Sequence, residues 1–246
     1  MAIPKIIHYC WFGKNPMPQQ FEKNIATWKT YCPDYELKLW TEENYDVHKN
    51  QYVAQAYDCQ KWAFVSDYVR LDVIATYGGI YLDTDVELIK GLDSLLSNDC
   101  FLALEYVNAV NTGLGFGAIP HHSFIIENRE IYDQASFLDE KGKPKLQTCV
   151  EITTQLLKKR GLQPVDKNQQ LGDITIYASD YFAPFQMATQ KLKLTPRTIG
   201  IHQYSASWKH QNKMVHWLWQ KTLPLKFKLR SWIGDEQYEA IKKKLK

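Results

Sequence analysis

The stretch that decides the fold runs from residue 60 to residue 86 and reads QKWAFVSDYVRLDVIATYGGIYLDTDV. Apolar residues recur every three or four positions in its first part, which predicts a long helix over Gln60–Tyr77. Gly78-Gly79 follows, and glycine readily adopts the left-handed conformation that ends many helices. Ile80–Val86 is then a short apolar segment that ends in acids. The stretch therefore predicts a helix, a tight turn and a buried strand that carries two carboxylates.

These acids are Asp83 and Asp85, with Thr84 between them. Residues i and i+2 of a strand point to the same side, so we expect both carboxylates to lie together just past the carboxyl end of a buried strand, where α/β sheets bind ligands. Two adjacent negative charges favour a cation between them, and oxygen ligands suit Mn²⁺ or Mg²⁺. Such a cation would neutralise a diphosphate. A solvated strand end is the alternative, because a lone Asp-x-Asp is a weak motif.

A second interpretation of the acids is the nucleophile loop of haloacid-dehalogenase-type phosphatases, in which the first Asp attacks phosphorus. Those enzymes also need a later Gly-Asp followed three or four residues on by another acid. Gly172-Asp173 is followed at these distances by Ile176 and Tyr177, so the pattern is incomplete.

The predicted helix carries a polar group ahead of the acids. Ser66, Asp67 and Arg70 are three or four positions apart and share one helix face. This group borders the apolar stripe, which would place it at the edge of the core. A local Asp67–Arg70 ion pair on the surface is the alternative, and it would contribute only tenths of a kcal/mol.

Strand-like and helix-like segments alternate on both sides of this stretch. Those before it are a strand within Ile3–Phe12, a helix after Pro18, a strand over Tyr35–Trp40 and a helix start at Thr41. Those after it are strands at Cys100–Glu105, Gly115–Ile119 and Ile174–Ala178, and helices at Glu127–Ser136 and Thr148–Arg160. This alternation predicts an α/β fold, and 246 residues are enough for one sizeable core.

Composition narrows the class of protein. A net charge of +3 gives no reason to expect a nucleic-acid partner. The five cysteines are widely spaced without a Cys-x-x-Cys pair, which favours reduced thiols and a cytoplasmic location. We see no secretory signal and no run of about 20 apolar residues that would span a membrane. His8 lies on the first expected strand and, as a lone histidine, is expected to be a core residue rather than a ligand.

Four blocks of sequence resemble one known family. They are the opening IPKIIHYCWFG at 3–13, AFVSDYVRL at 63–71, YGGIYLDTD at 77–85 and HQYSASW at 202–208. In this order they are similar to the glycosyltransferases described as a sugar-binding region containing a DXD motif. That family includes fungal initiating α-mannosyltransferases, bacterial capsular and exopolysaccharide transferases and, more distantly, clostridial glucosylating toxins.

The resemblance implies a single GT-A-type α/β domain over residues 1–208, built around a mixed, mostly parallel sheet. It also implies a retaining, metal-dependent transfer of a hexose from a nucleotide-diphosphate sugar to a glycan acceptor. From the bacterial relatives we expect a UDP-hexose, with UDP-galactose as the example, used in surface polysaccharide synthesis. A GDP-mannose-dependent mannosyltransferase is the alternative.

The resemblance assigns roles residue by residue. Asp83, Asp85 and His202 would hold the metal, and Asp83, Asp85 and Arg70 would be the catalytic group. The donor site would consist of Cys10 and Trp11 at the base, Asp67 and Arg70 at the ribose and sugar hydroxyls, Asp83 and Thr84, and Ser207 and Trp208 over the diphosphate. No second carboxylate stands out as a nucleophile, so we expect a front-face reaction assisted by the departing diphosphate oxygen.

The acceptor side is expected in the glycine-rich stretch Glu105–Gly117, where Asn108 and Asn111 could bind sugar hydroxyls. An ordinary glycine-rich connection is equally compatible with this stretch.

The C-terminal segment 209–246 is expected to be a helical appendage. It has ten Lys/Arg against three Asp/Glu, a net charge of +7 beside +3 for the whole chain. Aromatic residues among its lysines suggest peripheral contact with an anionic membrane on the inner face of the cell membrane, where a lipid-linked acceptor would be presented. A helix packed on the catalytic domain with a solvated basic face is the alternative.

A lectin-like module that binds sugar without transferring it also fits the aromatic residues and the acids. It gives no reason for a metal–diphosphate site beside an Asp/Arg helix. Nucleotide binding separates the two, because a lectin has no use for UDP or GDP.

Overall fold

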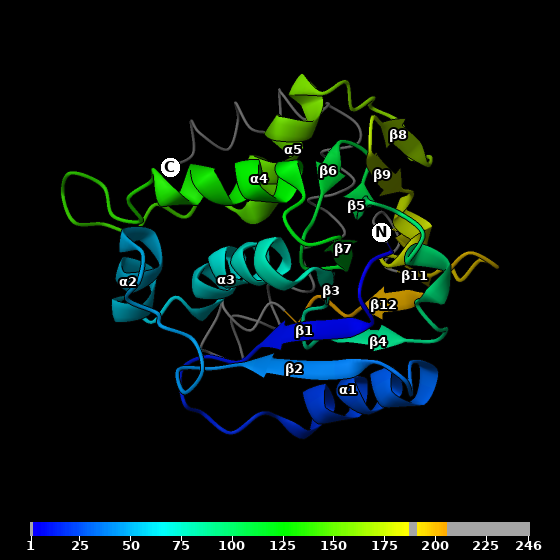
Figure 1. The fold of residues 1–246 in the computed structure, drawn as a ribbon, viewed down its shortest axis with the longest axis horizontal. Coiled ribbons are helices and arrows are strands. Elements are labelled where there is room, and N and C mark those ends of the chain that lie inside the picture. The colour runs from blue at the N-terminus through cyan, green and yellow to red at the C-terminus, as the bar shows by residue number, and fades with distance from the viewer. Residues whose placement is uncertain (1, 187–190, 206–246) are drawn as a thin grey trace.

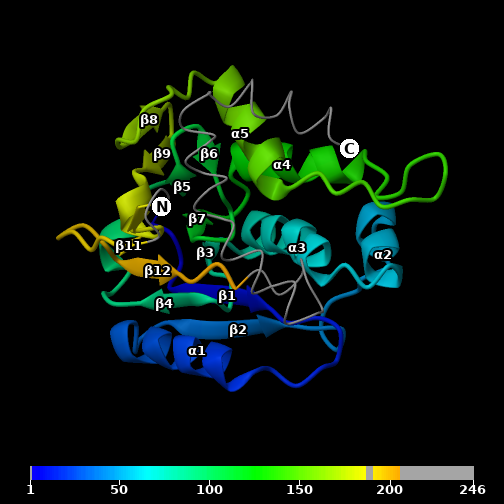
Figure 2. The same cartoon turned by 180° about the vertical axis from the view of Figure 1, so that it is seen from behind.

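The computed structural model describes residues 2–186 and 191–205, which form a mixed sheet with helices on both faces (Figures 1 and 2). The strands of the main sheet are β1 (Ile6–Cys10), β2 (Glu36–Trp40), β3 (Gly79–Tyr81), β5 (Cys100–Tyr106), β6 (Ala109–Val110), β7 (Phe116–Ala118), β8 (Gln169–Leu171) and β9 (Ile174–Tyr177). Their order is β2-β1-β3-β7-β5-β9-β8, with β6 paired to β5.

The strands of the main sheet do not all run in the same direction. β2, β1 and β3 pair in parallel, and β5 and β9 also pair in parallel. β7 lies antiparallel between β3 and β5, and β6 and β8 are antiparallel to their neighbours. Among the described residues, five strands of this sheet therefore run one way and three the other. This confirms the expected GT-A-type α/β architecture around a mixed, mostly parallel sheet.

Two apolar cores fill the two faces of the sheet. The helices are α1 (Gln19–Tyr31), α2 (Gln51–Asp58), α3 (Trp62–Tyr77), α4 (Ser123–Asp133) and α5 (Cys149–Lys159). Helices α2 to α5 pack on one face, and α1 packs on the other beside a two-stranded ribbon of β4 (Val86–Leu88) and β12 (Gly200–His202). Successive side chains of β5 point to opposite faces of the sheet and so belong to both cores. Leu102 and Leu104 lie in one core, and Phe101 and Ala103 lie in the other.

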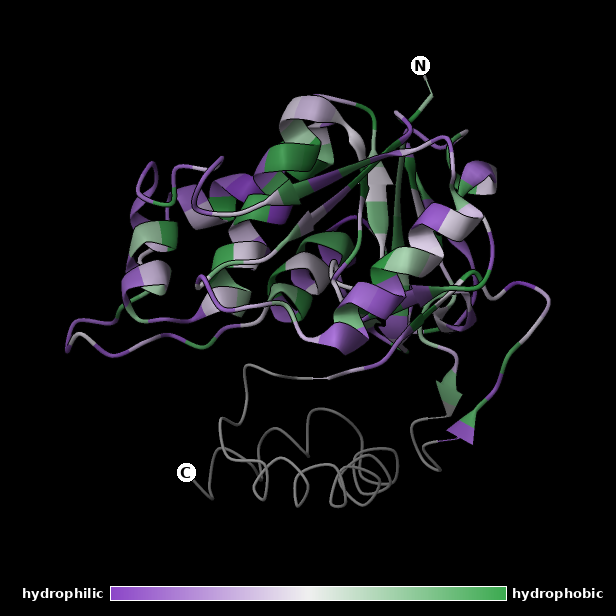
Figure 3. Ribbon diagram, turned by 90° about the horizontal axis from the view of Figure 1, so that it is seen from below, coloured by the Kyte–Doolittle hydropathy of each residue, from purple (hydrophilic) through white to green (hydrophobic). Residues whose placement is uncertain are grey.

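Three short elements complete the described fold. They are the 3₁₀ turns η1 (Asp93–Leu95) and η2 (Ser179–Tyr181) and the hairpin of β10 (Phe185–Gln186) with β11 (Lys191–Leu192). In Figure 3 the apolar colour is strongest on the strands, while each helix carries both apolar and polar residues.

Helix α3 is the predicted long helix, and it lies in the middle of the layer formed by α2 to α5 (Figure 1). It is buried around most of its circumference, so the polar residues Asp67, Arg70 and Asp72 are buried together with the apolar stripe. Gly78 ends it with a φ of 64°, and Gly79 follows with a φ of 101°. These angles favour glycine, which is why the local sequence was sufficient to place this boundary.

The predicted helix start at Thr41 is wrong. The Asn44 side chain accepts from the Thr41 backbone N–H, and Tyr45 N–H donates to Thr41 C=O, which makes a closed turn that does not continue. The helix begins ten residues later as α2, where Asn50 caps it by accepting from the N–H groups of Tyr52 and Val53. Asn50 was the start signal, since asparagine is a favoured N-cap.

The structure can be compared with several other expectations from the sequence. The five cysteines are free. His8 is fully buried, with Nε2 bonded to Gly78 C=O at 3.0 Å and Nδ1 accepting from Trp40 Nε1 at 3.1 Å, so it is a core histidine as expected. No helix among the described residues is long and apolar enough to cross a membrane. The appendage 209–246 and its membrane contact lie outside the described residues.

Candidate active site

The acid pair lies in a turn between β3 and β4, not in a strand. β3 ends at Tyr81, and Thr84 and Asp85 form the turn that leads to Val86. Asp83 N–H donates to Gly113 C=O at 3.1 Å, and Val86 N–H donates back to Asp83 C=O at 3.0 Å. The expectation that strand alternation aligns the carboxylates is therefore wrong, and a hydrogen-bonded turn brings them together instead.

Helix α1 fixes this turn from the opposite side. Asn24 Nδ2 donates to Thr84 C=O at 3.0 Å, and Trp28 Nε1 donates to Val86 C=O at 2.8 Å. Both side chains are buried on one face of the helix. Thr84, assigned to the donor by resemblance, thus has its carbonyl engaged in holding the turn. Asn24 was not singled out in the sequence, because only its position on the core face of α1 marked it.

A three-residue cluster with metal-ligand chemistry lies at this turn. One ligand atom each from Asp83, Asp85 and His202 can be chosen so that all lie within 4.8 Å of one another. The antiparallel pairing of β12 with β4 delivers the histidine, since His202 is in register with Val86. The structure therefore brings together, across about half of the chain, the three residues that the resemblance named for the metal.

Asp85 and His202 form a buried ion pair. The distance from His202 Nε2 to Asp85 Oδ1 is 3.1 Å, and Asp85 Oδ2 accepts from Ser205 Oγ at 2.8 Å and from Ser205 N at 3.0 Å. Burial alone would raise the pKa of Asp85, but the bonds from His202 and Ser205 outweigh it and lower that pKa. Burial likewise opposes the charged form of His202, yet the carboxylates of Asp85 and Asp83 raise the pKa of the imidazole.

Arg70 links the helix α3 to the acid turn. Its Nη2 lies 3.0 Å from Asp83 Oδ1, and its Nη1 lies 3.2 Å from Asp67 Oδ1. Only 3% of Arg70 is exposed, so the pair with Asp67 is not the surface ion pair considered as the alternative. The guanidinium also stacks over the Tyr81 ring at 4.8 Å from the ring centroid. A buried arginine with two carboxylates is well suited to hold hydroxyl groups in a fixed geometry.

The two carboxylates beside Arg70 differ from solvated acids. Burial raises the pKa of Asp67 to about 6, while Arg70 opposes this shift. Burial also raises the pKa of Asp83, again against Arg70. Tyr81 Oη donates to Asp83 Oδ1 at 3.0 Å, so this oxygen accepts from both the phenol and the guanidinium. Tyr81 was missed as a site residue, although its place two residues before Asp83 was the signal.

The segment 111–113 supports both Arg70 and Asp83. Thr112 Oγ1 accepts from Arg70 Nη1 at 3.3 Å, and Asn111 Oδ1 accepts from Gly113 N–H at 2.7 Å. A Cβ at Gly113 would collide with Asp83 Oδ2, so only glycine leaves room for that carboxylate. Sequence reasoning placed Asn111 here for an acceptor but missed Gly113, which was only one of three glycines in a predicted loop.

Cys149, in the first turn of α5, is a further residue of the site that the sequence did not reveal, and it contacts Arg70 and Asn111. Its Sγ lies 3.7 Å from Arg70 Nη1 and 3.9 Å from Asn111 Oδ1. The sequence placed Cys149 in the first turn of a helix but gave no sign of this contact, which depends on how α5 packs against α3.

The two residues that the resemblance assigns to the nucleotide base, Cys10 and Trp11, lie at the end of β1. Cys10 is buried among Tyr81, Ser66 and Arg70, and this burial raises the pKa of its thiol to about 12. Trp11 is half-buried with its ring edge-on to Phe21, and its Nε1 donates to Asn15 C=O at 2.7 Å.

The structure separates the two asparagines proposed for the acceptor. Asn111 belongs to the site through Gly113, and its Nδ2 lies 3.4 Å from Glu105 Oε2. Asn108 occupies the tight connection between β5 and β6, where its φ is 63°. It serves there as a turn residue in a left-handed conformation, which asparagine tolerates. Ser207 and Trp208 lie outside the described residues.

The ligand atoms of the cluster of Asp83, Asp85 and His202 fit a divalent cation. Two carboxylates and one imidazole offer hard oxygen and borderline nitrogen ligands, which match Mn²⁺ or Mg²⁺. The three carboxylates of Asp67, Asp83 and Asp85 outnumber the two basic side chains that pair with them, Arg70 and His202. Ser205 and Tyr81 orient the carboxylates from outside the cluster, as outer partners of metal ligands commonly do.

Comparison with known proteins finds a family model that matches part of the chain. Residues 18–102 match the family model described as "Glycosyltransferase sugar-binding region containing DXD motif". This region is similar to the DXD glycosyltransferases, and it makes up about a third of the chain. The match spans α1, α3 and the acid turn, and it accords with the resemblance seen in the sequence.

Curated proteins similar to this chain include several fungal mannosyltransferases. The chain is 31% identical over 134 residues to inositol phosphoceramide mannosyltransferase 3 of Schizosaccharomyces pombe, which covers 51% of this chain and 36% of the relative. It is 25% identical over 188 residues to the initiation-specific alpha-1,6-mannosyltransferase of Candida albicans, covering 70% and 49% respectively. The chain thus spans about a third to a half of the length of these relatives.

Among solved structures, the chain is similar to the PaToxG glycosyltransferase, with a TM-score of 0.48, 17% identity and coverage of 64% of this chain and 69% of that one. A glycosyltransferase involved in glycosylation of the major capsid of PBCV-1 gives a TM-score of 0.44 with 12% identity, covering 82% and 94%.

Proposed function

We propose that this protein is a metal-dependent glycosyltransferase that moves a hexose from a nucleotide-diphosphate sugar to a hydroxyl of a glycan or glycolipid. The observation that carries the proposal is the junction of two groups within one hydrogen-bonded network, at the half-buried Asp83. Asp83 belongs at the same time to the metal-type cluster with Asp85 and His202 and to the hydroxyl-binding pair of Arg70 and Asp67. A diphosphate and its attached sugar require such neighbouring sites.

Each part of this network has a distinct task. A divalent cation, when bound by Asp83, Asp85 and His202, would neutralise the diphosphate and make it a better leaving group. Arg70 and Asp67 would accept and donate hydrogen bonds to the hexose hydroxyls and fix the ring in place. Tyr81 and Thr112 keep the guanidinium from rotating, because one stacks on it and the other accepts from Nη1.

We propose transfer with retention on the front face of the sugar. The bond between the anomeric carbon and the diphosphate oxygen breaks, the acceptor oxygen bonds to that carbon from the same side, and the acceptor proton passes to the departing diphosphate. The carboxylates of Asp67 and Asp83 are held by Arg70, and that of Asp85 by His202 and Ser205. Engaged carboxylates are poor nucleophiles, which supports a reaction without a glycosyl-enzyme intermediate.

For the donor, we propose GDP-mannose in preference to the UDP-hexose that the sequence led us to expect. Five relatives, each 27–32% identical over about half of this chain, carry mannosyltransferase or mannosyl in their names. GDP-mannose is therefore the first donor to test. A UDP-sugar stays the alternative, since the human alpha-1,4-N-acetylglucosaminyltransferase is 39% identical over 72 residues, 29% of this chain and 20% of that enzyme.

The acceptor is proposed to be a lipid-linked glycan or polyol. Its support is that the names of several relatives specify inositol phosphoceramide, a lipid with a polyol head. These fungal relatives give no support to a role in bacterial surface polysaccharides.

The phosphatase alternative loses support from the structure. It requires Asp173 near the acid pair, but Asp173 lies in the β8–β9 turn, and its Oδ2 is 3.2 Å from His122 Nε2. Asp83, which would be the nucleophile, has Oδ1 engaged by Arg70 and Tyr81.

A donor screen tests the proposed function. Release of nucleoside diphosphate from GDP-mannose, UDP-galactose, UDP-glucose and UDP-N-acetylglucosamine would be measured with Mn²⁺, with Mg²⁺ and with a chelator. We expect GDP release from GDP-mannose that requires metal and is lost in Asp85→Asn. Release of UDP alone would move the donor to the alternative, and no release from any donor with either metal would contradict the transferase proposal.

A further inference from the structure

The carboxyl ends of three neighbouring parallel strands form one edge of the main sheet. β3 leads into the acid turn at Asp83, β1 ends at Cys10, and β2 ends at Trp40. In Figure 1 the arrows of β1 and β2 point toward α2 and the start of α3. On the other side of β3 lies β7, which runs the opposite way. Since α/β sheets bind ligands outside the carboxyl ends of their strands, a nucleotide held at the acid turn would extend over β1 and β2.

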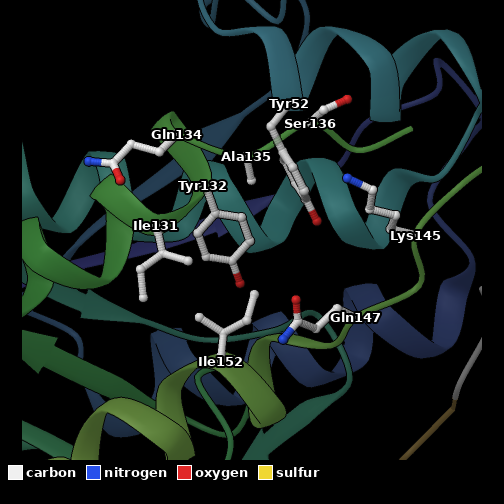
Figure 4. A pocket seen from close by; sticks show the side chains of 9 residues that line it. All are labelled: Tyr52, Ile131, Tyr132, Gln134, Ala135, Ser136, Lys145, Gln147 and Ile152. Atoms are coloured by element: carbon white, nitrogen blue, oxygen red, sulfur yellow. The ribbon is translucent and has the colours of Figure 1, made fainter. Parts of the chain in front are cut away.

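The hollow drawn in Figure 4 does not belong to this edge. Its lining residues come from α2, from α4 and the segment that follows it, and from residues 145–152. None of these lining residues belongs to β1, β2 or β3. We therefore expect the nucleotide outside the strand ends and not in this hollow.

Glu42, two residues after the end of β2, has a carboxylate in a fixed orientation. Its Oε1 accepts from Gly13 N–H at 2.6 Å and from Tyr57 Oη at 3.1 Å. Gly13 belongs to the loop after β1, and Tyr57 belongs to α2. Both bonds use the same oxygen, so Oε2 has no hydrogen-bond partner within residues 2–186 and 191–205.

The second oxygen of Glu42 is open to solvent. It is not one of the buried side-chain atoms that lack a partner, as the hydroxyl oxygens of Tyr132 and Tyr204 are. No Lys, Arg or His in the described part of the chain forms an ion pair with this half-buried carboxylate. An ionised carboxylate accepts hydrogen bonds and donates none. Oε2 is therefore placed to accept from N–H groups of a ligand.

Two aromatic rings flank this carboxylate. Tyr57, which holds Oε1, meets the Trp62 ring edge to face, with the ring centroids 5.2 Å apart. Trp62 in turn lies against the backbone of Gly13, where an added Cβ would come within 2.7 Å of the indole. Both rings are half-buried, so each keeps part of its surface exposed. Nucleobases stack on aromatic surface of this kind.

The end of β1 and the helix α3 connect this group to the candidate active site. Cys10 lies beside Arg70, and three residues further on Gly13 bonds to Glu42. In α3, Trp62 precedes Arg70 by eight residues, which is about 12 Å along the helix axis. This separation leaves room for a ribose and a diphosphate between a base at Trp62 and a hexose at Arg70.

We propose that Glu42 and Trp62 bind a guanine base, so that the donor is a guanine-nucleotide sugar. The inference rests on the proposed function and gives a reason for this donor that does not depend on the names of relatives. Guanine carries two adjacent N–H donors, N1–H and the 2-amino group, which suit the acceptor Oε2. Uracil carries a single N–H between two carbonyl oxygens, so it would set a carbonyl oxygen against the carboxylate.

The test is Glu42→Gln, which keeps the shape of the side chain and places an amide NH₂ where Oε2 was. The amide oxygen can still accept from Gly13 and Tyr57. Dissociation constants for GDP, IDP, XDP and UDP would be measured by titration calorimetry with Mn²⁺ present. Inosine lacks the 2-amino group, and xanthosine has a carbonyl oxygen in its place. Glu43→Gln is the matched control, since Glu43 is the adjacent and exposed acid, and thermal unfolding verifies the fold of both variants.

We expect the wild-type protein to bind GDP about tenfold or more tightly than IDP or UDP, because each lacks a hydrogen bond to a charged group. Glu42→Gln should weaken GDP by a similar factor and strengthen XDP, because the amide NH₂ donates to the carbonyl at position 2. Glu43→Gln should bind all four nucleotides as wild type does. Trp62→Leu should weaken all four by about fivefold or more, because stacking does not depend on the identity of the base.

Three results would overturn the guanine site. The wild-type protein could bind IDP or UDP at least as tightly as GDP, a measurement that does not depend on how the variants fold. Glu42→Gln could keep all four wild-type dissociation constants, or Trp62→Leu could do so. Each of these results leaves the metal-dependent transferase in place with its base bound elsewhere. Failure of all four nucleotides to bind with Mn²⁺ is distinct, since it would overturn the proposed function and the guanine site together.

Discussion

Arg70 and Asp83 are joined at 3.0 Å between Nη2 and Oδ1, although one belongs to the middle of α3 and the other to the turn after β3. The same guanidinium holds Asp67 through Nη1 at 3.2 Å. This fork connects the helix that would hold the sugar to the turn that would hold the metal. In the proposed function Arg70 is a structural and a functional residue at once, and its substitution should reveal both.

Arg70→Lys should therefore be costly despite keeping the charge. A single ammonium cannot bridge both carboxylates in the geometry of the guanidinium fork, and it leaves one buried carboxylate without its partner. We expect a loss of about 3 kcal/mol in the free energy of unfolding, measured by denaturant titration, and a fall of about 100-fold in transfer. Arg197→Lys is the control, because Arg197 is 54% exposed at its pair with Asp180 and should cost less than about 1 kcal/mol. Equal effects of the two substitutions would refute the role given to Arg70.

Gly113→Ala should disrupt the acid turn specifically. Its Cβ would occupy the place of Asp83 Oδ2, so the carboxylate must rotate away from the cluster. We expect Mn²⁺-dependent nucleotide binding to be lost while the far-ultraviolet circular dichroism stays the same. Gly142→Ala is the control: its φ of 72° makes the substitution cost about 1 kcal/mol, yet its Cβ would meet nothing within 4 Å. Normal metal-dependent binding in Gly113→Ala would show that Asp83 does not need this space.

Glu105→Gln tests the front-face reaction. Glu105 is close enough to His202 to affect the pKa of the imidazole, and its Oε2 lies 3.4 Å from Asn111 Nδ2. It is therefore the first carboxylate to examine as a possible nucleophile. The substitution should leave transfer within about tenfold of wild type, because it keeps shape and removes only charge. Mass spectrometry of the wild-type protein with donor should detect no glycosylated Glu105; a covalent adduct there would end the front-face proposal.

We expect the buried His8 to make the free energy of unfolding depend on pH. Burial lowers its pKa from 6.5 to about 4 in the folded protein. Between these values the unfolded chain binds more protons than the folded one, so stability is fully present above about pH 6.5 and is lost as the pH falls toward 4. The loss from this residue should be about 3 kcal/mol. Unfolding free energies of wild type and His8→Gln at pH 7.5 and 5 should capture about 2 kcal/mol of this loss, and the variant should show a smaller decrease. Parallel pH profiles would show that His8 does not carry the effect.

Local features of the sequence were sufficient for α3 and its end. The helical stripe and Gly78-Gly79 act within one element, so no knowledge of the rest of the chain was needed. The same holds for α5, where Thr148 and Glu151 form a capping box. Thr41 shows the limit, because a residue that can begin a helix can equally close a turn when the Asn44 side chain accepts from its backbone N–H.

The site depends on contacts that a sequence pattern does not carry. His202 reaches the acids because β12 pairs with β4, and strands of three residues give little periodic signal. The resemblance, not the spacing, supplied that residue. Gly113 and Cys149 were missed for the same reason, since their roles come from the packing of the 111–113 segment and α5 against α3. The two aspartates were predicted to lie together by strand alternation, and they do so through a turn instead.

The most direct test of the central claim is a thermal-shift titration with GDP and with UDP, each with and without Mn²⁺, on wild type and Asp85→Asn. A nucleotide at a hundred times its dissociation constant adds about 2.7 kcal/mol of stability, which is several degrees for a chain of this size. We predict that one nucleotide stabilises the wild-type protein only when metal is present and that Asp85→Asn abolishes the shift. No shift with either nucleotide, or a shift that needs no metal and survives in Asp85→Asn, would contradict a metal-dependent nucleotide-sugar site at this turn.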